Sequence, residues 1–398
     1  MPANKRKTLG IYIHIPFCRS KCDYCDFYSL AGKEDRMEDY QKALTAHIRE
    51  TAPLARGYVV DTIYIGGGTP SYYGEKRLRE LLALLKKRFQ IAKDAEITCE
   101  VNPDSADGKG LKKLRRAGVN RISLGMQSAC QRELQAVHRP HTAEQTDEAV
   151  AAARKAGIKN LSLDLIYGLP GQDFDSWKTT VDHALALGPE HLSCYGLKVE
   201  EGTELACRVE RGERLPDDDT QADLYLWTVD YLKQAGYEQY EISNFSKIGM
   251  ASRHNLRYWY TKPYIGFGPG AHSDFGGRRY SFVRDLEGYI DGVLKGGTLL
   301  DGNDLIPERE RSSEYLMLRL RTTRGIEEWE YRRKFLMDFE PIEHKLAEYE
   351  HYGWAEKAGG RWRLTPKGFL VSNQLIADLQ ECQEKETLAK MLEHNGRK

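Results

Sequence analysis

The sequence predicts an α/β fold, in which a partial (β/α)6 barrel is followed by a smaller, mostly helical and winged-helix-like domain. Three observations predict this class. Short β-rich runs alternate with helical runs from residue 10 to about residue 235. These β-rich runs are apolar on both faces, which is typical of parallel strands buried between helices. Beyond residue 303 the pattern changes to helices, interrupted by two strand-like runs around Gly359 and Gly360.

The six β-α units can be placed in chain order. The predicted strands are the apolar runs at residues 10–16, 61–67, 96–103, 121–127, 161–170 and 191–199. The predicted helices lie at residues 35–51, 75–89, 109–117, 129–156 and 176–187. Gly118, Gly157 and Gly236 fall where helix C-caps are expected. Parallel strands connected in this way end at one edge of the sheet, which is where β/α barrels keep their active sites.

The chain is predicted to divide into three segments. Residues 1–235 form the barrel domain, residues 236–300 a connecting region rich in Tyr and Gly, and residues 301–398 the C-terminal domain. Residues 210–220 are polar and are predicted to be a surface linker before a helix at 219–235. In the C-terminal domain, helices at 308–320 and 326–335 precede a hairpin in WAEKAGGRWRLT, which is the arrangement of a winged-helix unit.

Composition limits the partners of the protein. Lys plus Arg and Asp plus Glu both number 59, so the formal net charge is zero, whereas nucleic-acid binding favours a basic excess. We therefore expect no nucleic-acid partner, and a structural or partner-docking role for the winged-helix-like unit. No apolar run approaches the ~20 residues of a membrane span, and the polar N-terminus does not resemble a signal peptide. We expect a cytoplasmic location.

Three of the eight cysteines, Cys18, Cys22 and Cys25, lie within eight residues, directly after the first predicted strand. In a reducing compartment so dense a group favours a metal site over a disulfide framework. Three thiolates on a four-iron cluster leave one iron without a protein ligand, and an open position is typical of a catalytic metal centre. The remaining cysteines are scattered, and we expect them to pack in the core. One alternative is a closed zinc site formed by the three cysteines and His14.

Other polar groups follow the next strands. GGGTP, at residues 66–70, leaves the second strand, and its glycines would let backbone groups approach a ligand closely or simply form a tight turn. Glu100, Gln127 and Asp164 lie on the third, fourth and fifth strands. A buried carboxylate is costly without a partner. Either these residues contact a zwitterionic ligand that bears a sugar, or Arg121 and Arg139 satisfy them as structural salt bridges.

An ordered series of motifs resembles one protein family. YIHIPFCRSKCDYCDF, GGGTPS, NPD, RISLGMQS, LDLIYGLPGQ, YEISNF, HNLRYW and GFGPGAH match in order over residues 10–275, and LRTTRGI and RLTPKGFLVSN extend the match. With these motifs the chain resembles radical S-adenosylmethionine (radical SAM) proteins, specifically the HemW-type heme chaperones, which are relatives of oxygen-independent coproporphyrinogen III oxidase.

The resemblance implies a set of cofactor contacts. Cys18, Cys22 and Cys25 would ligate a 4Fe–4S cluster, with S-adenosylmethionine on the fourth iron, where its reductive cleavage gives a 5′-deoxyadenosyl radical. Gly67, Gly68 and Thr69 would bind the methionyl amino group. The other residues implied to contact the cofactor are Tyr12, Tyr24, Glu100, Gln127, Arg139 and Asp164. The family also implies heme as a ligand, a heme-acceptor protein, and an electron donor such as flavodoxin or ferredoxin. It leaves room for peripheral contact with membrane proteins.

Two segments bear on the choice between chaperone and oxidase. In coproporphyrinogen oxidases a further cysteine stands two residues after the third, and here that position is Phe27. This difference favours a chaperone over the alternative function, coproporphyrinogen III dehydrogenase. In HNLRYW, His254 is chemically suited to ligate heme iron while Tyr258 and Trp259 pack on the porphyrin. The alternative interpretation is a loop histidine beside two core aromatic residues.

Overall fold

The computed structural model describes residues 7–396 of the chain. These residues form two compact units. The first comprises residues up to Tyr225 together with Ser246–Arg257 and Lys262–Leu305, and the second comprises Leu226–Phe245, Tyr258–Thr261 and the residues from Ile306 onward. The segment between residues 236 and 300 is therefore shared by the two units, and the chain passes between them more than once.

Six parallel strands form the centre of the first unit, as the sequence predicts. They follow one another across the sheet in chain order: β1 (Lys7–Ile15), β4 (Tyr58–Gly67), β5 (Ile91–Val101), β6 (Arg121–Gln127), β7 (Asn160–Tyr167) and β8 (His191–Gly196). The sheet formed by the described residues is open, in agreement with a partial barrel.

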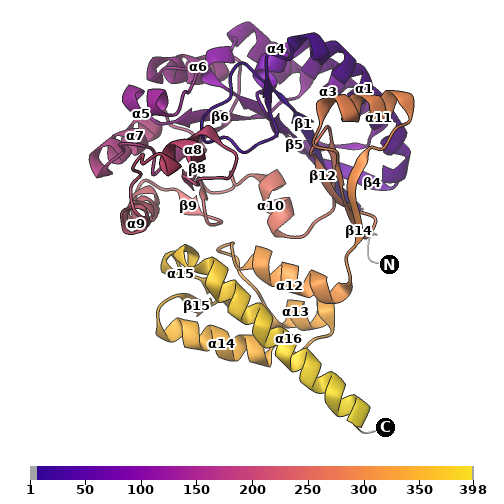
Figure 1. Cartoon of the computed structure of the whole chain (residues 1–398), viewed down its shortest axis with the longest axis vertical. Coiled ribbons are helices and arrows are strands. Elements are labelled where there is room, and N and C mark those ends of the chain that lie inside the picture. The colour runs from indigo at the N-terminus through magenta and orange to yellow at the C-terminus, as the bar shows by residue number, and fades with distance from the viewer. Residues whose placement is uncertain (1–6, 397–398) are drawn as a thin grey trace. The chain divides into compact units, whose positions relative to one another are not determined.

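Helices cover the outer face of these strands (Figure 1). The helices of the β-α units are α1 (Met37–Thr51), α2 (Pro70–Tyr73), α3 (Glu75–Arg88), α4 (Gly108–Ala117), α5 (Gln131–Ala136), α6 (Ala143–Lys155) and α7 (Phe174–Ala186). Residues alternate between the two faces of a strand. On β1 the fully buried Ile11, Ile13 and Ile15 therefore share one face, and Tyr12 and His14 share the other.

The strands after residue 260 extend the sheet, in the region where the sequence predicted irregular structure with short strands. β11 (Tyr264–Phe267) pairs in parallel with the free side of β1, and antiparallel pairing adds β12 (His272–Phe275), β13 (Arg278–Phe282) and β14 (Leu300–Leu305). Gly276 and Gly277 both have positive φ, as a two-residue hairpin turn between β12 and β13 requires. This Gly-Gly pair was the sequence signal for a hairpin.

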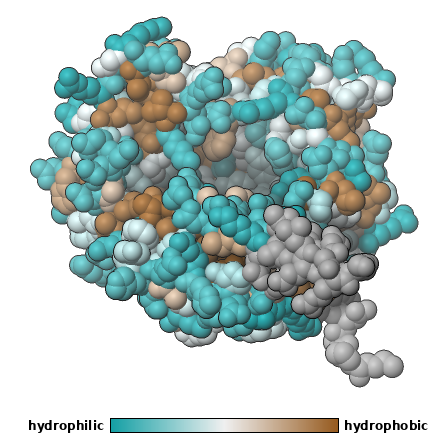
Figure 2. All heavy atoms as spheres, turned by 60° about the horizontal axis from the view of Figure 1, so that its bottom comes forward, coloured by the Kyte–Doolittle hydropathy of each residue, from teal (hydrophilic) through white to brown (hydrophobic). Residues whose placement is uncertain are grey.

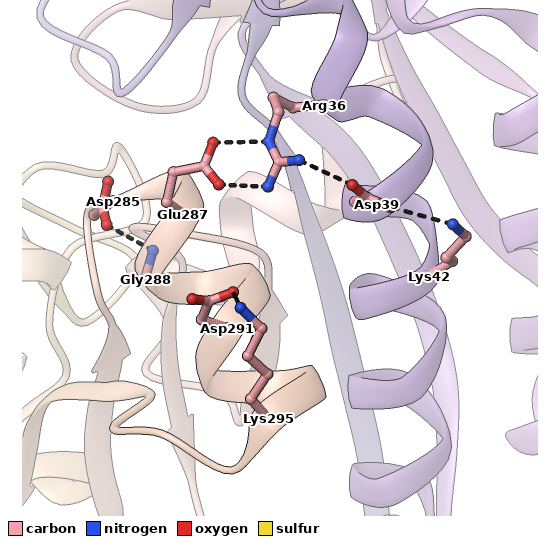
Figure 3. Close-up of polar contacts among 8 residues, drawn as sticks. All are labelled: Arg36, Asp39, Lys42, Asp285, Glu287, Gly288, Asp291 and Lys295. Carbon is pink, nitrogen blue, oxygen red and sulfur yellow. Dashed lines mark hydrogen bonds and ion pairs between the residues drawn. The ribbon is translucent and has the colours of Figure 1, made fainter.

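Helix α11 (Leu286–Lys295) follows β13 and packs beside α1 (Figure 3). Glu287, in the first turn of α11, accepts two hydrogen bonds from Arg36, which also pairs with Asp39 of α1. The Asp285 side chain caps α11 by accepting a hydrogen bond from the Gly288 N–H at 2.6 Å. These contacts attach the sheet extension to the first β-α unit.

Helix α10 (Arg253–Trp259) contacts the sheet through polar and charged groups. The Glu96 side chain on β5 accepts hydrogen bonds from the backbone N–H groups of Arg253 and His254, at 3.0 and 2.9 Å. The buried Arg257 side chain pairs with Asp61 and lies directly over Gly10, where a β-carbon would come within 2.4 Å of it. Helix α10 is thus held by carboxylates on two neighbouring strands, β4 and β5, and Gly10 on β1 leaves room for the Arg257 side chain.

The second unit is mostly helical and contains the predicted hairpin. Its elements are α12 (Glu308–Arg319), α13 (Glu328–Phe335), α14 (Glu340–His351), β15 (Ala355–Ala358), β16 (Arg361–Leu364), α15 (Pro366–Leu370) and α16 (Ser372–Gly396). Its core is formed by side chains such as Tyr315, Leu316, Tyr331, Phe339, Leu346, Trp362 and Phe369. Helices that pack on a two-stranded hairpin agree with the winged-helix-like pattern of the sequence.

The chain between the sixth parallel strand and α10 forms α8 (Glu204–Glu210), α9 (Asp218–Gln234), β9 (Glu238–Gln239) and β10 (Asn244–Ser246). Two short strands, β2 (Phe17–Cys18) and β3 (Leu30–Ala31), pair with each other on either side of the cysteine loop. None of the described helices is both long enough and apolar enough to span a membrane. In the face shown in Figure 2, polar side chains predominate and the hydrophobic ones lie in small, separate groups.

Candidate functional site

The three clustered cysteines lie on the loop that follows β1, at the carboxyl edge of the parallel strands. All three are free and partly buried. Thr69 Oγ1 donates a hydrogen bond to Cys18 Sγ at 3.4 Å, and Arg139 Nη1 donates one to Cys22 Sγ at 3.4 Å. Burial raises the pKa of the Cys18 and Cys25 thiols. Metal binding at this loop would therefore displace thiol protons, and hydrogen-bond donors already face two of the sulfurs.

His14 supports the loop and is not placed as a metal ligand. Its Nδ1 lies 2.9 Å from the Tyr12 hydroxyl, and its Nε2 lies 2.7 Å from the Tyr28 carbonyl oxygen. Both ring nitrogens are thus engaged, which counts against the zinc alternative. Among the described residues, no three His, Cys, Asp or Glu side chains are gathered closely enough for one metal ion. The cysteines of an iron–sulfur cluster bind separate irons, so their sulfurs are spread more widely than the ligands of one ion.

The glycine turn after β4 packs against the cysteine loop. The Gly68 N–H donates to the Ile15 carbonyl at 2.8 Å, and the Thr69 N–H donates to the Phe17 carbonyl at 2.8 Å. A β-carbon on Gly68 would come within 2.8 Å of both carbonyl oxygens. Gly67 has φ +110° and lies against the His14 ring. The absence of side chains is therefore required by the protein's own packing, which fixes this turn beside Cys18.

Glu100 lies on the inner face of the sheet, beside the turn. Its carboxylate accepts hydrogen bonds from the Tyr64 hydroxyl at 2.7 Å and from the Gly67 N–H at 3.0 Å. Burial raises the pKa of Glu100 to about 7. Tyr12 neighbours Tyr64 across β1 and β4, with ring centroids 6.3 Å apart. A cationic group bound beside this carboxyl would lower its pKa and favour the charged form.

Arg139 connects several of the predicted residues. Beyond Cys22, its guanidinium donates to the Tyr24 hydroxyl at 3.3 Å, to the Gly125 carbonyl at 3.1 Å and to the Asn102 side chain. A β-carbon on Gly125 would meet both Arg139 Nη2 and Gln127 Nε2, so the Gln127 amide lies beside the same guanidinium. Arg139 Nε is buried and has no hydrogen-bond partner. An incompletely satisfied, buried cation at this edge favours an anionic ligand group.

Asp164 is held by serines of three adjacent strands. It accepts hydrogen bonds from Ser193 at 2.7 Å, from Ser123 at 3.0 Å and from Ser162 at 3.4 Å. Burial raises the pKa of Asp164 even though these bonds oppose the shift. Arg121 is buried nearby, but its Nε and Nη1 have no hydrogen-bond partner. The salt-bridge alternative is therefore not what the structure shows, since hydroxyl and backbone groups hold both carboxylates.

The structure thus brings most of the predicted residues to one edge of the sheet. Sequence reasoning missed Asn102, which contacts Arg139, and Tyr64, which contacts Glu100. Asn102 belongs to the NPD motif directly after β5, so its place after a strand was a usable signal. Tyr64 reads as an ordinary strand residue, and no sequence signal separates it from its neighbours.

His254 is placed differently from the sequence expectation of a heme ligand. Its side chain is fully buried, its Nδ1 lies 2.9 Å from Thr62 Oγ1, and its ring stacks on Tyr64. Burial lowers the pKa of His254 to about 3, so the ring is neutral. A porphyrin cannot reach this ring while α10 keeps its position. The heme-ligand role of His254 stays a prediction, and in the described arrangement the side chain is a core residue.

Two family models match the chain. Residues 12–184 match the radical SAM superfamily, and residues 306–371 match the HemN C-terminal domain. The heme chaperone HemW of Mycobacterium tuberculosis (strain ATCC 25618 / H37Rv) is 37% identical over 378 residues, which is 94% of this chain and 95% of the relative. The heme chaperone HemW of Bacillus subtilis (strain 168) is 34% identical over 368 residues, or 92% of this chain and 97% of the relative.

The fold also matches a solved structure. Coproporphyrinogen III oxidase (HemN) from Escherichia coli, described as a radical SAM enzyme, superposes with a TM-score of 0.81 at 24% sequence identity. The match covers 96% of this chain and 91% of the other. At this identity the likeness shows a shared fold.

Proposed function

Since the chain belongs to the HemW family of the radical SAM superfamily, we propose that it is a heme chaperone that binds heme and transfers it to an acceptor protein. The observation that carries the proposal is similarity to proteins named heme chaperones over more than nine-tenths of both chains. The acceptor is a protein that the sequence does not identify.

The proposal includes a 4Fe–4S cluster held by Cys18, Cys22 and Cys25, with S-adenosylmethionine bound exchangeably beside it. Three free thiols on one loop support this assignment, because thiolates are the usual ligands of iron–sulfur clusters. His14 supports the same loop through its contact with the Tyr28 carbonyl oxygen. When bound and reduced, the cluster would supply an electron to the sulfonium of S-adenosylmethionine. We propose flavodoxin or ferredoxin as the class of electron donor, and a reducing cytoplasm as the compartment that keeps the thiols free.

Each residue at the sheet edge has a role in this proposal. Glu100 and the backbone of Gly67 and Gly68 would receive the methionyl ammonium group, and Arg139 would receive the carboxylate. Thr69 would orient Cys18 through the hydrogen bond to its sulfur. The remaining contacts are assigned to residues that border the same edge or the inner face, namely Tyr12, Tyr24, Gln127 and Asp164.

His254 is the histidine that the family motif offers as a heme ligand. It lies on α10, and its side chain is fully buried against Thr62 and Tyr64 of β4. We propose His254 as a heme ligand only for a state in which α10 has left its place on β4 and β5. Contact with an acceptor protein at a membrane surface is compatible with this role and is part of the same proposal.

A second candidate function is coproporphyrinogen III dehydrogenase, because the fold matches that of an enzyme of this class. The position at which the sequence comparison expects an additional cysteine carries Phe27, whose side chain is 68% exposed. A phenylalanine cannot replace a thiol in metal binding or proton transfer. This difference favours the chaperone.

One experiment separates the two candidates. Anaerobically reconstituted protein is titrated with heme and, in parallel, incubated with coproporphyrinogen III, S-adenosylmethionine and a reductant. We expect saturable heme binding in the absorbance titration, release of heme to a heme-free b-type cytochrome, and no decarboxylation of coproporphyrinogen III. Turnover of the porphyrinogen, or absence of heme binding, would contradict the proposal.

A further inference from the structure

The cysteine loop is held by a contact between Asp23, which belongs to the cysteine motif, and two side chains from outside the quoted motifs, His138 and Arg208. Asp23 lies between Cys22 and Tyr24 on this loop, and its side chain is only 7% exposed. Its Oδ2 lies 2.7 Å from His138 Nδ1 and accepts a hydrogen bond from Arg208 Nη1. The Asp23 carboxylate is thus buried beneath an exposed histidine and a partly buried arginine, and a charge-assisted hydrogen bond from Arg208 fixes the backbone that carries it.

Backbone contacts support the same attachment on two sides. The Asp23 N–H donates to the Val137 carbonyl at 3.3 Å, and the Asp23 carbonyl accepts from the Leu205 N–H at 2.9 Å. The loop is therefore joined both to the segment after α5 and to the start of α8. Tyr24, the next residue, packs on a buried cluster that includes Val137 and Leu205.

The contacts of Asp23 and Arg208 also reach the segment that carries Arg139. His138, directly before Arg139, has φ +50°, a conformation that is costly for residues other than glycine. Arg208 donates a further hydrogen bond, at 2.7 Å, to the Ala136 carbonyl in the same segment. Asp23 and Arg208 thus hold the strained turn that presents the Arg139 guanidinium to Cys22 and Tyr24.

We propose that Asp23, His138 and Arg208 form a loop clamp whose function is to position Cys22 against Arg139, so that the cluster is retained and correctly oriented. These are positioning residues, since none of them contacts the cysteine sulfurs. The inference rests on the proposed function for its reference to the cluster. Arg208 is supplied by α8, which follows the sixth parallel strand.

Two variants and a matched control test the clamp. Asp23→Asn keeps the shape of the side chain and removes its charge, whereas Arg208→Lys keeps the charge and loses the forked geometry. Glu213→Gln is the control, because Glu213 contacts Arg208 at 2.5 and 2.6 Å on its other nitrogens and does not touch Asp23. A double variant, Asp23→Asn with Arg208→Lys, measures whether the two residues act as one unit.

The first measurement uses the cluster-free protein. Hydrogen exchange of amides in residues 18–28 should be about tenfold faster in Asp23→Asn and Arg208→Lys, since a buried charge-assisted contact no longer opposes local opening. Exchange elsewhere, and in Glu213→Gln, should match the parent protein. The double variant should exchange no faster than the more affected single variant.

The second measurement uses the reconstituted protein. The two clamp variants should lose iron to a chelator about tenfold faster than the parent, in step with the faster opening of the loop, and should give an altered electron paramagnetic resonance spectrum on addition of S-adenosylmethionine. If the parent holds no cluster, the proposed function fails while the exchange result still decides the clamp. If the parent holds its cluster and both variants exchange and retain iron like the parent, the clamp is overturned and the proposed function stands.

Discussion

At the residue scale, His254 shows how burial decides which chemistry a side chain can offer. The motif HNLRYW contains groups that suit a heme, and nothing in the sequence tells an exposed histidine from a buried one. In the structure the backbone N–H groups of Arg253 and His254 satisfy Glu96, and the His254 ring contacts Thr62 and Tyr64. The spacing of the three cysteines restricts their chemistry more tightly, and the structure leaves all three free on one loop.

The placement of His254 predicts a pH-dependent stability. In the folded protein the pKa of His254 is lowered to about 3, whereas the unfolded chain binds a proton on this ring near pH 6.5. The unfolded state therefore binds more protons between these values, and stability rises with pH through this window. The contribution is fully present above about pH 6.5 and decreases by about 1.4 kcal/mol per pH unit well below it.

The variant His254→Asn tests this prediction by urea unfolding of the cluster-free protein at several pH values. At pH 7.5 we expect the variant to be less stable by about 1–3 kcal/mol, because buried packing and a hydrogen bond are lost. At pH 5 the difference should be smaller by about 2 kcal/mol, since only the parent carries the histidine penalty. Stability curves that run parallel from pH 7.5 to pH 5 would show that the ring is not buried in its neutral form.

At the element scale, the turn after β4 depends on contacts that sequence patterns do not report. The glycines were expected either to let backbone groups approach a ligand or to form a tight turn. In the structure Gly67 lies against the His14 ring and Gly68 against the backbone of the cysteine loop. Short strands were expected between residues 236 and 290, but the addition of β11–β14 to the main sheet was not predicted, for a related reason. Their pairing with β1 is a long-range contact, and only the Gly276-Gly277 turn marked it locally.

Gly68→Ala should displace the cysteine loop. The added β-carbon would lie 2.8 Å from the Ile15 and Phe17 carbonyl oxygens, and neither backbone group can rotate away. We expect the free energy of unfolding to fall by about 1–3 kcal/mol and cluster occupancy after reconstitution to decrease.

Gly108→Ala is the matched control for this substitution. Its added β-carbon would find only the Ala152 Cβ, at 3.6 Å, at the start of α4. Stability and iron content should therefore remain at or slightly above those of the parent. Equal iron content and stability in Gly68→Ala and Gly108→Ala would contradict the packing described for the turn.

At the scale of the whole molecule, the order of the six parallel strands and the helix–hairpin pattern of the second unit could be predicted from the sequence. The alternation of β-rich and helical runs predicts the parallel strands, and the change to helices beyond residue 303 predicts the second pattern. The division into units could not be predicted, because residues 226–261 contribute to each unit in turn. The clamp of Asp23, His138 and Arg208 could not be predicted either, since its members are separated by up to 185 residues.

The most direct test of the account is the iron content and magnetic spectrum of the chain after anaerobic reconstitution with ferrous iron and sulfide. We expect about four irons per chain, a reduced-state resonance that changes when S-adenosylmethionine is added, and loss of both in Cys22→Ser. Cys382→Ser, which alters a cysteine of α16 outside the loop, should keep both. A parent protein without a cluster, or a Cys22→Ser variant with the parent's spectrum, would contradict the account.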